Sequence, residues 1–402
     1  MTELHDFGTI VLLVGLGFSL AVGASKLSER FLVPAPALLL VAAAIASDIF
    51  PSLGERLSIR TVERIGVAAL VIILFDGGTR IGLRRMRVAG LPVLSLGVLG
   101  TFATAGVTMV AARWLLGFSW TTAGLVGAAI APTDPAVMFS VLGRREVSGR
   151  TGTILEGESG VNDPVGIALM IGLLDFATSD HGSAWTIVRE FALEMSVGLV
   201  VGIAGAYFLL PLLQRITLPR EGLYPLRTLA AAALVYGAAS VLHGSGFLAV
   251  FVAGILIGDR EQPHRAVVES FFTSLASLAE IAVFIALGLT IHLTGLSARV
   301  WLEGFVLALV LTLAARPLSV GALLLRSRLR VGERLFVIWG GLKGAVPIFL
   351  AAFAILAGVR DAGRIYGIVF VVVLLSVVVQ GTTIPLAARL TGVPMRPLRP
   401  DE

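Results

Sequence analysis

Long apolar segments, separated by short polar or charged connections, follow one another along almost the whole chain. A transmembrane helix needs about 20 predominantly apolar residues to cross the hydrocarbon core of a bilayer. Of the 402 residues, 56% are hydrophobic and 14% are charged, whereas a typical soluble domain has about 25% charged residues. A chain of this kind cannot bury its apolar surface in water, so we expect an all-α polytopic membrane protein.

Thirteen apolar segments are predicted to be transmembrane helices. They are residues 7–27, 34–50, 59–79, 89–116, 120–142, 151–177, 184–214, 222–242, 245–258, 264–291, 298–325, 331–357 and 364–388. The first segment lacks a basic region before it and a small-residue cleavage site after it, so we expect it to be retained as a helix. No soluble domain, low-complexity tract or long linker interrupts the series, and we expect residues 1–402 to form a single transmembrane domain.

The basic residues lie in the short connections. A nucleic-acid binder would instead concentrate them in one patch or stripe. If the N-terminus lies outside, most of the 31 Lys and Arg residues fall in connections on the inner side, including Arg144 and Arg399, while fewer, such as Arg56, fall outside. This asymmetry predicts a multi-pass protein of the cell (inner) membrane with a cytoplasmic C-terminus. The expected partner of its surface is the lipid bilayer, and no nucleic acid is expected.

Thirteen helices divide into six, one and six. The units of about 7–177 and 222–388, linked by the helix at 184–214, would then have opposite topology. Inverted repeats of this kind are common in secondary transporters, whose binding sites form where broken helices meet near the bilayer midplane.

The fifth segment has a predicted break in its middle. Pro132 and Pro135 lie mid-span, where proline removes a backbone donor and clashes with the preceding turn. Between them, Thr133 precedes Asp134, which suits an N-cap, while Pro135 suits the first helical position. We therefore predict two half-helices, with the Asp134 carboxylate facing the positive N-terminus of the second.

The twelfth segment has a matching break. Gly340, Gly341 and Gly344 can end one half-helix, and Pro347 can begin another. Lys343 lies between them, where its charge would offset the negative C-terminal end of the first half-helix. Proline kinks alone are ordinary in membrane helices, but a costly charge inside each break, at equivalent positions, favours a functional pair of crossed broken helices.

The sixth segment carries a carboxylate beside other oxygen-bearing side chains. Ser159 precedes Asn162 by three residues and Asp163 by four, so the three side chains share one helix face. Hydroxyl, amide and carboxylate oxygens suit a hard cation. Burial in the bilayer disfavours the ionised form of Asp163, whereas a bound cation favours it. Such a group can hold a proton or a cation but not readily both, which is the physical basis of exchange.

A buried arginine, Arg316 in the eleventh segment, needs a partner. Glu158 is the favoured choice, because it points to a different side of the helix from Asp163. Two alternatives remain open: Arg316 could pair with Glu280 of the tenth segment, or it could extend to the cytoplasmic side.

Three motifs resemble those of the monovalent cation:proton antiporters of the NhaP type. They are G-E-S-G-V-N-D-P at 157–164, T-D-P at 133–135 and W-G-G-L-K-G-A-V-P at 339–347. The resemblance implies a homodimer that exchanges Na⁺ or K⁺, and possibly Li⁺, for H⁺ by alternating access; these ions are transported, and no cofactor is expected. It implies that Asp163 binds the transported cation or proton and that Ser159, Thr133 and Asp134 supply ligands or shape the site. It also implies that Asn162 marks electroneutral exchange and that Glu158 and Arg316 form a structural ion pair.

Two other functions compete with this hypothesis. A carrier of an anion or organic solute could use a similar scaffold with half-helix N-termini at the anion, although Asp134 at such an end argues against it. An intramembrane enzyme would need a nucleophile–base pair or a metal cluster. The chain has no cysteine, no H-E-x-x-H motif and only five histidines, so we expect no enzymatic activity.

Overall fold

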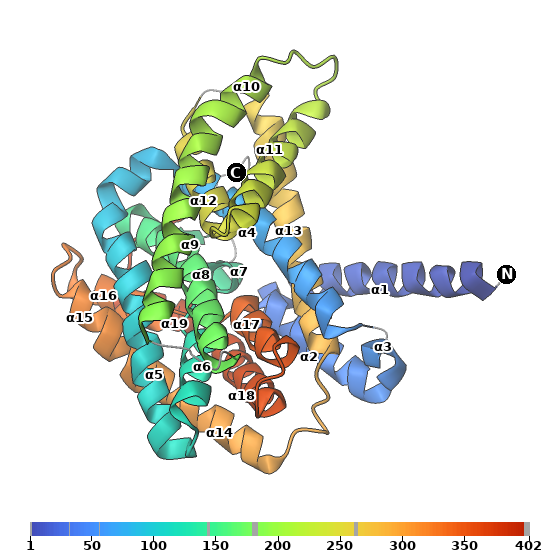
Figure 1. Ribbon diagram of the computed structural model, residues 1–402, viewed down its shortest axis with the longest axis vertical. Helices are drawn as coiled ribbons and strands as arrows, with labels where there is room; N and C mark the ends of the chain where they lie inside the picture. Colours follow the sequence, from blue (N-terminus) through green and yellow to red (C-terminus); the bar gives the residue numbers. More distant parts are fainter. Residues whose placement is uncertain are drawn as a thin grey trace.

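The fold is a bundle of helices connected by short turns (Figure 1). The computed structural model describes residues 2–31, 33–55, 57–142, 145–178, 184–260 and 264–397. Arg56, Arg144 and Arg399, which belong to the predicted charge asymmetry, lie outside the described residues, as do the two ends of the expected 1–402 domain.

The helices up to residue 214 correspond to the first seven predicted segments. A bend at Gly82, which has a φ of 65° that suits glycine, divides α4 into the third and fourth of these segments. The helices are α1 (Thr2–Phe31), α2 (Ala35–Ile49), the short α3 (Pro51–Glu55), α4 (Ile59–Leu94) running through the π-helix η1 (Ser95–Gly100) into α5 (Thr101–Leu116), α6 (Trp120–Ile130), α7 (Pro135–Leu142), α8 (Gly149–Thr178), and α9 (Ala184–Ala204) running through η2 (Gly205–Leu209) into α10 (Leu210–Gln214).

The remaining helices correspond to the last six segments. They are α11 (Leu223–Val241), α12 (Gly246–Gly258), α13 (Arg265–Leu289), α14 (Ala298–Val310) running through η3 (Leu311–Ala315) and η4 (Pro317–Gly321) into α15 (Ala322–Leu324), α16 (Val331–Trp339), α17 (Ala345–Leu356), and α18 (Ala362–Leu375) running through η5 (Ser376–Gln380) into α19 (Gly381–Thr391). Among the described residues, seven helical stretches are long and apolar enough by themselves to cross a membrane. The polytopic all-α prediction is therefore confirmed.

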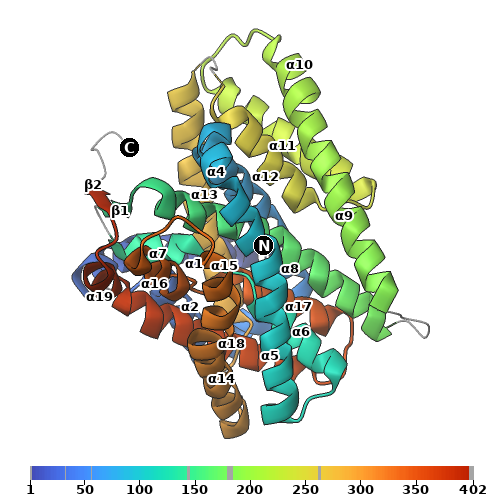
Figure 2. The same cartoon turned by 90° about the vertical axis from the view of Figure 1, so that its left-hand side faces the viewer.

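Two short strands are the exception to the all-helical expectation. β1 (Arg145–Val147) pairs antiparallel with β2 (Met395–Pro397), with Val147 opposite Met395 (Figure 2). Three residues are too few to show the alternating pattern that identifies a strand in a sequence. The pair ties the connection after α7 to the segment after α19.

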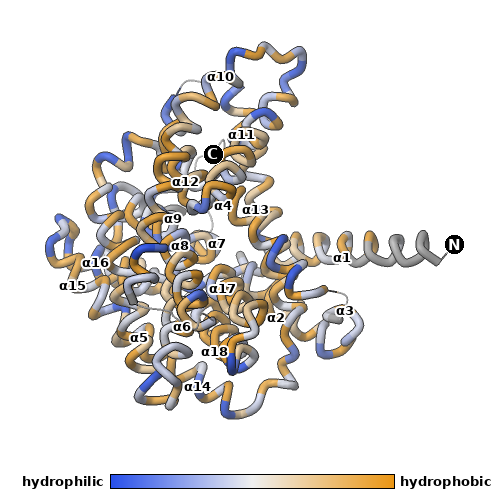
Figure 3. The backbone as a smooth tube through the Cα atoms, in the orientation of Figure 1, coloured by the Kyte–Doolittle hydropathy of each residue, from blue (hydrophilic) through white to orange (hydrophobic). Residues whose placement is uncertain are grey.

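Close helix packing depends on glycine at several crossings. A Cβ on Gly78 of α4 would lie 2.5 Å from the Phe251 carbonyl oxygen of α12, and one on Gly254 would lie 2.6 Å from the Phe75 carbonyl oxygen. Small residues allow this backbone approach, which is the usual means of association between helices in lipid. Apolar residues dominate along the helices, and polar residues gather in the connections (Figure 3).

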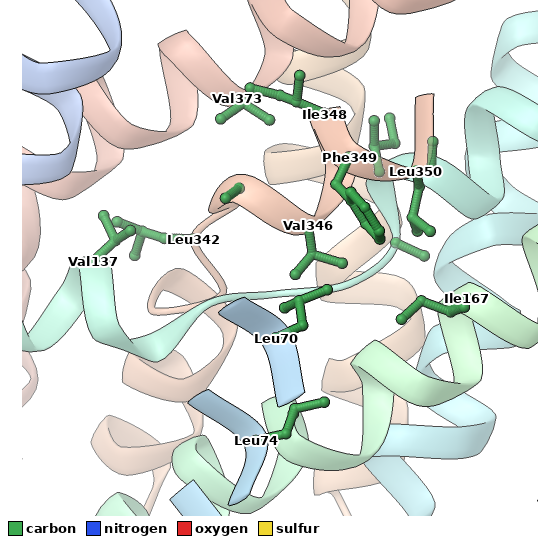
Figure 4. Packing of buried hydrophobic residues seen from close by; sticks show 14 of the residues in the cluster. Leu70, Leu74, Val137, Ile167, Leu342, Val346, Ile348, Phe349, Leu350 and Val373 are labelled. Carbon is green, nitrogen blue, oxygen red and sulfur yellow. The ribbon is translucent and has the colours of Figure 1, made fainter. Parts of the chain in front are cut away.

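The interior is built around the broken helices. Figure 4 shows Leu70 and Leu74 of α4, Val137 of α7, Ile167 of α8 and Phe349 of α17 among the buried side chains there. In contrast, α1 extends away from the other helices (Figure 1) and exposes apolar side chains, among them Leu12 and Val22.

Candidate functional site

The first broken helix consists of α6 and α7, separated by residues 131–134. The backbone N–H of Ala136 donates to Oδ1 of Asp134 at 2.9 Å, so Asp134 caps α7 as its position before Pro135 predicts. The sequence thus forms a helix end within the span, because two prolines interrupt the backbone bonds and an acidic side chain satisfies the new N-terminus.

The second broken helix consists of α16 and α17, separated by residues 340–344. α17 begins at Ala345, two residues before the predicted start at Pro347, with Gly344 at its N-cap position. The N–H of Asp134 donates to the carbonyl oxygen of Leu342 at 2.8 Å. This bond joins the two breaks directly, so the predicted crossing of the broken helices is present.

Lys343 neutralises the end of the opposite broken helix. It is fully buried, and its Nζ donates to the carbonyl oxygens of Ala131 and Pro132 at 2.8 and 2.9 Å. These carbonyls belong to the C-terminal end of α6, so the expectation that Lys343 serves its own half-helix, α16, is wrong. The reason is the crossing, which brings the free carbonyls of α6 within reach of the long lysine side chain.

Arg316 serves the end of α16 instead. Its Nη2 donates to the Val337 carbonyl at 3.1 Å and its Nε donates to the Ile338 carbonyl at 3.2 Å. The same guanidinium forms a bidentate ion pair with Glu158, at 2.8 and 3.3 Å. Both side chains are buried. Of the alternatives that the sequence left open, the structure has the Glu158 pair rather than a pair with Glu280.

Asp134 lies at two helix N-termini at once. Besides capping α7, its carboxylate lies against the start of α17, because a Cβ on Gly344 would be 1.9 Å from Asp134 Oδ2. The four half-helix ends are therefore balanced by three charges: Lys343 at α6, Arg316 at α16, and Asp134 at α7 and α17. Each sign is the one that the helix dipole favours at that end.

Asp163 lies beside this crossing, on α8, and is 6% exposed. Within the described part of the chain, its Oδ1 is buried without a hydrogen-bond partner. The preceding residue, Asn162, forms reciprocal bonds with Thr133: Nδ2 donates to Thr133 Oγ1 at 2.7 Å, and the Thr133 N–H donates to Oδ1 at 3.3 Å. One turn later, a Cβ on Gly166 would lie 2.4 Å from Pro132 Cγ, so α8 closely follows the first break.

Ser159 precedes Asp163 by one helical turn and is buried. No hydrogen bond of its hydroxyl group occurs among the described residues. The structure therefore unites Thr133, Asn162 and Asp134 through bonds around the break, while Ser159 and Asp163 share the adjacent face of α8.

Ser376, which was not predicted from the sequence, supports the second break. Its hydroxyl accepts the Lys343 N–H at 3.0 Å and donates to Oε1 of Gln380 at 2.7 Å. The η5 segment thus supports the second break. The signal was a lone glutamine in a long apolar run, where a polar side chain usually bonds a neighbour.

Two further carboxylates differ in their surroundings. Asp76 forms an ion pair with Arg80 at 2.8 Å, one turn further along α4. Glu280 of α13 has a buried Oε1 without a hydrogen-bond partner among the described residues.

Two crossed broken helices, balanced by charges at their interrupted ends and flanked by a buried carboxylate, form the architecture of a secondary transporter. The chain belongs to the sodium/hydrogen exchanger family, whose transmembrane model matches residues 16–390. This match, together with the relatives named NhaP2 that follow, confirms the resemblance to NhaP-type antiporters that the motifs indicated.

Proteins similar to this chain are named as potassium/proton antiporters in some cases and as sodium/proton antiporters in others. The chain is 33% identical over 399 residues to the K(+)/H(+) antiporter NhaP2 of Shewanella sp. (strain MR-4), covering 98% of this chain and 69% of that protein. It is 27% identical to the Na(+)/H(+) antiporter NhaH of Halobacillus dabanensis, covering 97% and 99%. The structure of the sodium proton antiporter MjNhaP1 from Methanocaldococcus jannaschii has the same fold, with a TM-score of 0.81 at 23% identity over 96% of this chain and 100% of that one.

Proposed function

We propose that this protein exchanges a monovalent cation, Na⁺ or K⁺, for H⁺ at a single site on Asp163. The observation that carries the proposal is the buried Asp163 Oδ1, which has no hydrogen-bond partner among the described residues. A buried ionised carboxylate oxygen without a donor is costly. A proton or a cation removes that cost, and each excludes the other.

The neighbouring groups suggest separate tasks. Both polar atoms of the Asn162 amide are occupied by Thr133, so we assign Asn162 to positioning the Thr133–Asp134 segment. Ser159, whose hydroxyl lacks a partner among the described residues, is the better candidate for a neutral oxygen ligand. A site with one carboxylate and neutral oxygens suits a monovalent cation, and the described residues contain no group of three His, Cys, Asp or Glu side chains that could hold a metal ion.

Alternating access then requires the site to face each side of the membrane in turn. We take residues of about 7–177 and 222–388 as inverted repeats that meet at the two breaks, and we place the protein in the cell membrane with its N-terminus outside. We also propose a homodimer, with the exposed apolar surface of α1 as part of the contact.

An anion carrier on this scaffold is disfavoured by the electrostatics. An anion would bind at the half-helix N-termini, but the Asp134 carboxylate already lies at those of α7 and α17.

The test is a transport assay in proteoliposomes, with Na⁺ and K⁺ supplied separately and the internal pH followed by a dye. Asp163→Asn should abolish cation-driven proton movement, because the amide can neither release a proton nor neutralise a cation. In the unaltered protein, competition predicts that the apparent cation affinity falls as the pH is lowered, by up to tenfold per pH unit where the site is mostly protonated.

The matched control is Asp76→Asn, which removes a different buried carboxylate whose partner is Arg80. It should retain exchange. Exchange that survives Asp163→Asn in a correctly folded protein would refute the assignment.

A further inference from the structure

A basic cavity lies at the end of the bundle where β1 and β2 pair. Its volume is about 420 Å³, within the range of roughly 300–1,000 Å³ typical of small-molecule sites. Arg84, Arg85, Arg150 and Arg396 line it, together with one carboxylate, Glu156. The rest of its wall is mainly apolar or glycine, so the cavity has a cationic part and an apolar part.

Three distant parts of the chain build this cavity. Arg84 and Arg85 follow the Gly82 bend in α4, Arg150 lies in the first turn of α8, and Arg396 lies in β2. The walls are joined by close packing, because β1 pairs with β2 and a Cβ on Gly157 of α8 would lie 2.7 Å from Cγ2 of Val93 in α4. The cavity is therefore part of the packed fold rather than a gap between loose segments.

The side chains of Arg84, Arg85 and Arg150 have no carboxylate partner among the described residues. Arg150 Nε is buried without a hydrogen-bond partner in the described part of the chain. Within that same part, no carboxylate forms an ion pair with the side chain of Arg84, Arg85 or Arg150; only the backbone N–H of Arg84 bonds a carboxylate, Asp259 Oδ2, at 2.6 Å. Glu156 and Arg396 have other interactions. We therefore do not count Glu156 as the counter-charge of Arg84, Arg85 or Arg150.

Converging arginines repel one another, and a buried guanidinium nitrogen without an acceptor is costly. An anion between them would remove both penalties. Guanidinium groups match phosphate oxygens in geometry and can bind them bidentately. The apolar wall would tolerate the carbon chain attached to such a group.

We propose that this cavity is a binding site for a phosphate-bearing anion, supplied by an acidic lipid headgroup or by a soluble phosphate compound. The side of the membrane on which these arginines are predicted to lie is the cytoplasmic one, where both sources are present. A bound phosphate would bridge Arg84 and Arg85 to Arg150, and so connect the bend of α4 to the start of the helix that carries Glu158 and Asp163.

The test measures binding directly on the purified full chain in a neutral detergent. Native mass spectrometry and thermal unfolding are followed with phosphatidylglycerol, with inorganic pyrophosphate, and with phosphatidylcholine as the zwitterionic reference. We expect one of the two anions, but not phosphatidylcholine, to be retained and to raise the melting temperature. Arg150→Gln should weaken that binding at least tenfold, and so should the double change Arg84→Gln with Arg85→Gln.

The matched control is Arg87→Gln, which removes an exposed arginine of the same helix that does not line the cavity. It should bind as the unaltered protein does. Retention of phosphatidylglycerol alone identifies a lipid headgroup site, and retention of pyrophosphate identifies a soluble ligand. Binding of neither anion, or binding that both cavity variants retain in full, would overturn the proposal. If Arg150→Gln fails to fold, the binding of the double variant Arg84→Gln with Arg85→Gln, which changes two exposed side chains, tests the proposal.

A regulatory effect is a second readout, and it rests on the proposed exchange function. Added anion should change the exchange rate of the unaltered protein and of Arg87→Gln, but not that of the cavity variants. Since binding is measured without transport, a failure of the exchange assay leaves the test of the site intact.

Discussion

Two carboxylates five residues apart on α8 have different surroundings, because the helices that face them carry different side chains. Glu158 meets the guanidinium of Arg316 in a bidentate pair. Beside Asp163, Asn162 and Thr133 bond each other, and Oδ1 of Asp163 has no donor among the described residues. A paired carboxylate keeps its charge, whereas an unpaired one can exchange a proton for a cation. Environment, and not residue type, therefore separates Glu158, which is held in an ion pair, from Asp163, which we propose to be the transporting acid.

This difference predicts how stability responds to changes at Glu158. Glu158→Gln leaves the buried Arg316 charge without its partner, and breaking a buried pair costs about 3–5 kcal/mol. We expect a clearly lower melting temperature in detergent. Replacing both residues with apolar side chains, Glu158→Leu with Arg316→Met, should recover part of the loss. Recovery should be incomplete, because the Val337 and Ile338 carbonyls also lose their donor.

The measurement is thermal unfolding of Glu158→Leu, of Arg316→Met and of the double variant that combines them, with Glu158→Gln measured beside them. A non-additive cycle, with the double variant more stable than Arg316→Met alone, is expected for a coupled pair. Strictly additive losses would show that the pair contributes little beyond its separate contacts.

At the scale of helices, each of the two broken helices supplies the charged side chain that compensates a helix end of the other. Lys343 comes from the second break and neutralises α6 of the first, while Asp134 comes from the first break and lies at the start of α17 in the second. Neither break can therefore reorganise without removing a charge from the other. The bond from Asp134 N–H to Leu342 O adds a direct link between them.

Gly344 leaves the least space between the start of α17 and the Asp134 carboxylate. A Cβ there would lie 1.9 Å from Asp134 Oδ2 and 2.5 Å from its Cβ, so Gly344→Ala should push the carboxylate away from the start of α17. We expect a loss of transport of at least tenfold together with a lower melting temperature. Gly237→Ala on α11 is the control, because nothing lies within 4 Å of its added Cβ. There, alanine should be neutral or stabilising by about 0.4–1 kcal/mol.

Transport rates in proteoliposomes and melting temperatures in detergent provide the measurements. Equal behaviour of the two alanine variants would show that Asp134 has room to move and that its contact with α17 is not required.

The sequence predicted the helical segments and both breaks because apolar length, proline and glycine act locally. It also placed Asp134 at the start of α7, since a cap is decided by neighbouring residues. It could not assign Lys343 to α6, because that contact depends on how two distant helices cross. The β1–β2 pair and the basic cavity were missed for the same reason: each joins segments near residues 150 and 396, and the strands are only three residues long.

At the scale of the whole molecule, the buried charges around the crossed breaks cancel, apart from that of Asp163. Glu158 balances Arg316, and Asp134 and Lys343 are of opposite sign within the crossed breaks. This leaves Asp163 as the proposed exchangeable charge. Glu280 on α13 is the remaining buried carboxylate without a full set of partners among the described residues. The number of charges moved in each cycle depends on whether Glu280 also exchanges its proton.

We expect electroneutral exchange, in which one cation replaces one proton on Asp163. The exchange rate in proteoliposomes should then be the same under a membrane potential of either sign. For Na⁺ exchange the potential is imposed with valinomycin and a K⁺ gradient. For K⁺ exchange it is imposed with a lipophilic ion. Glu280→Gln should leave this insensitivity unchanged, since a neutral amide replaces a group that takes no part in the cycle. If a potential accelerates exchange by the unaltered protein and Glu280→Gln removes the acceleration, Glu280 carries a second proton. Acceleration that persists in Glu280→Gln would instead show that the single-site stoichiometry is wrong.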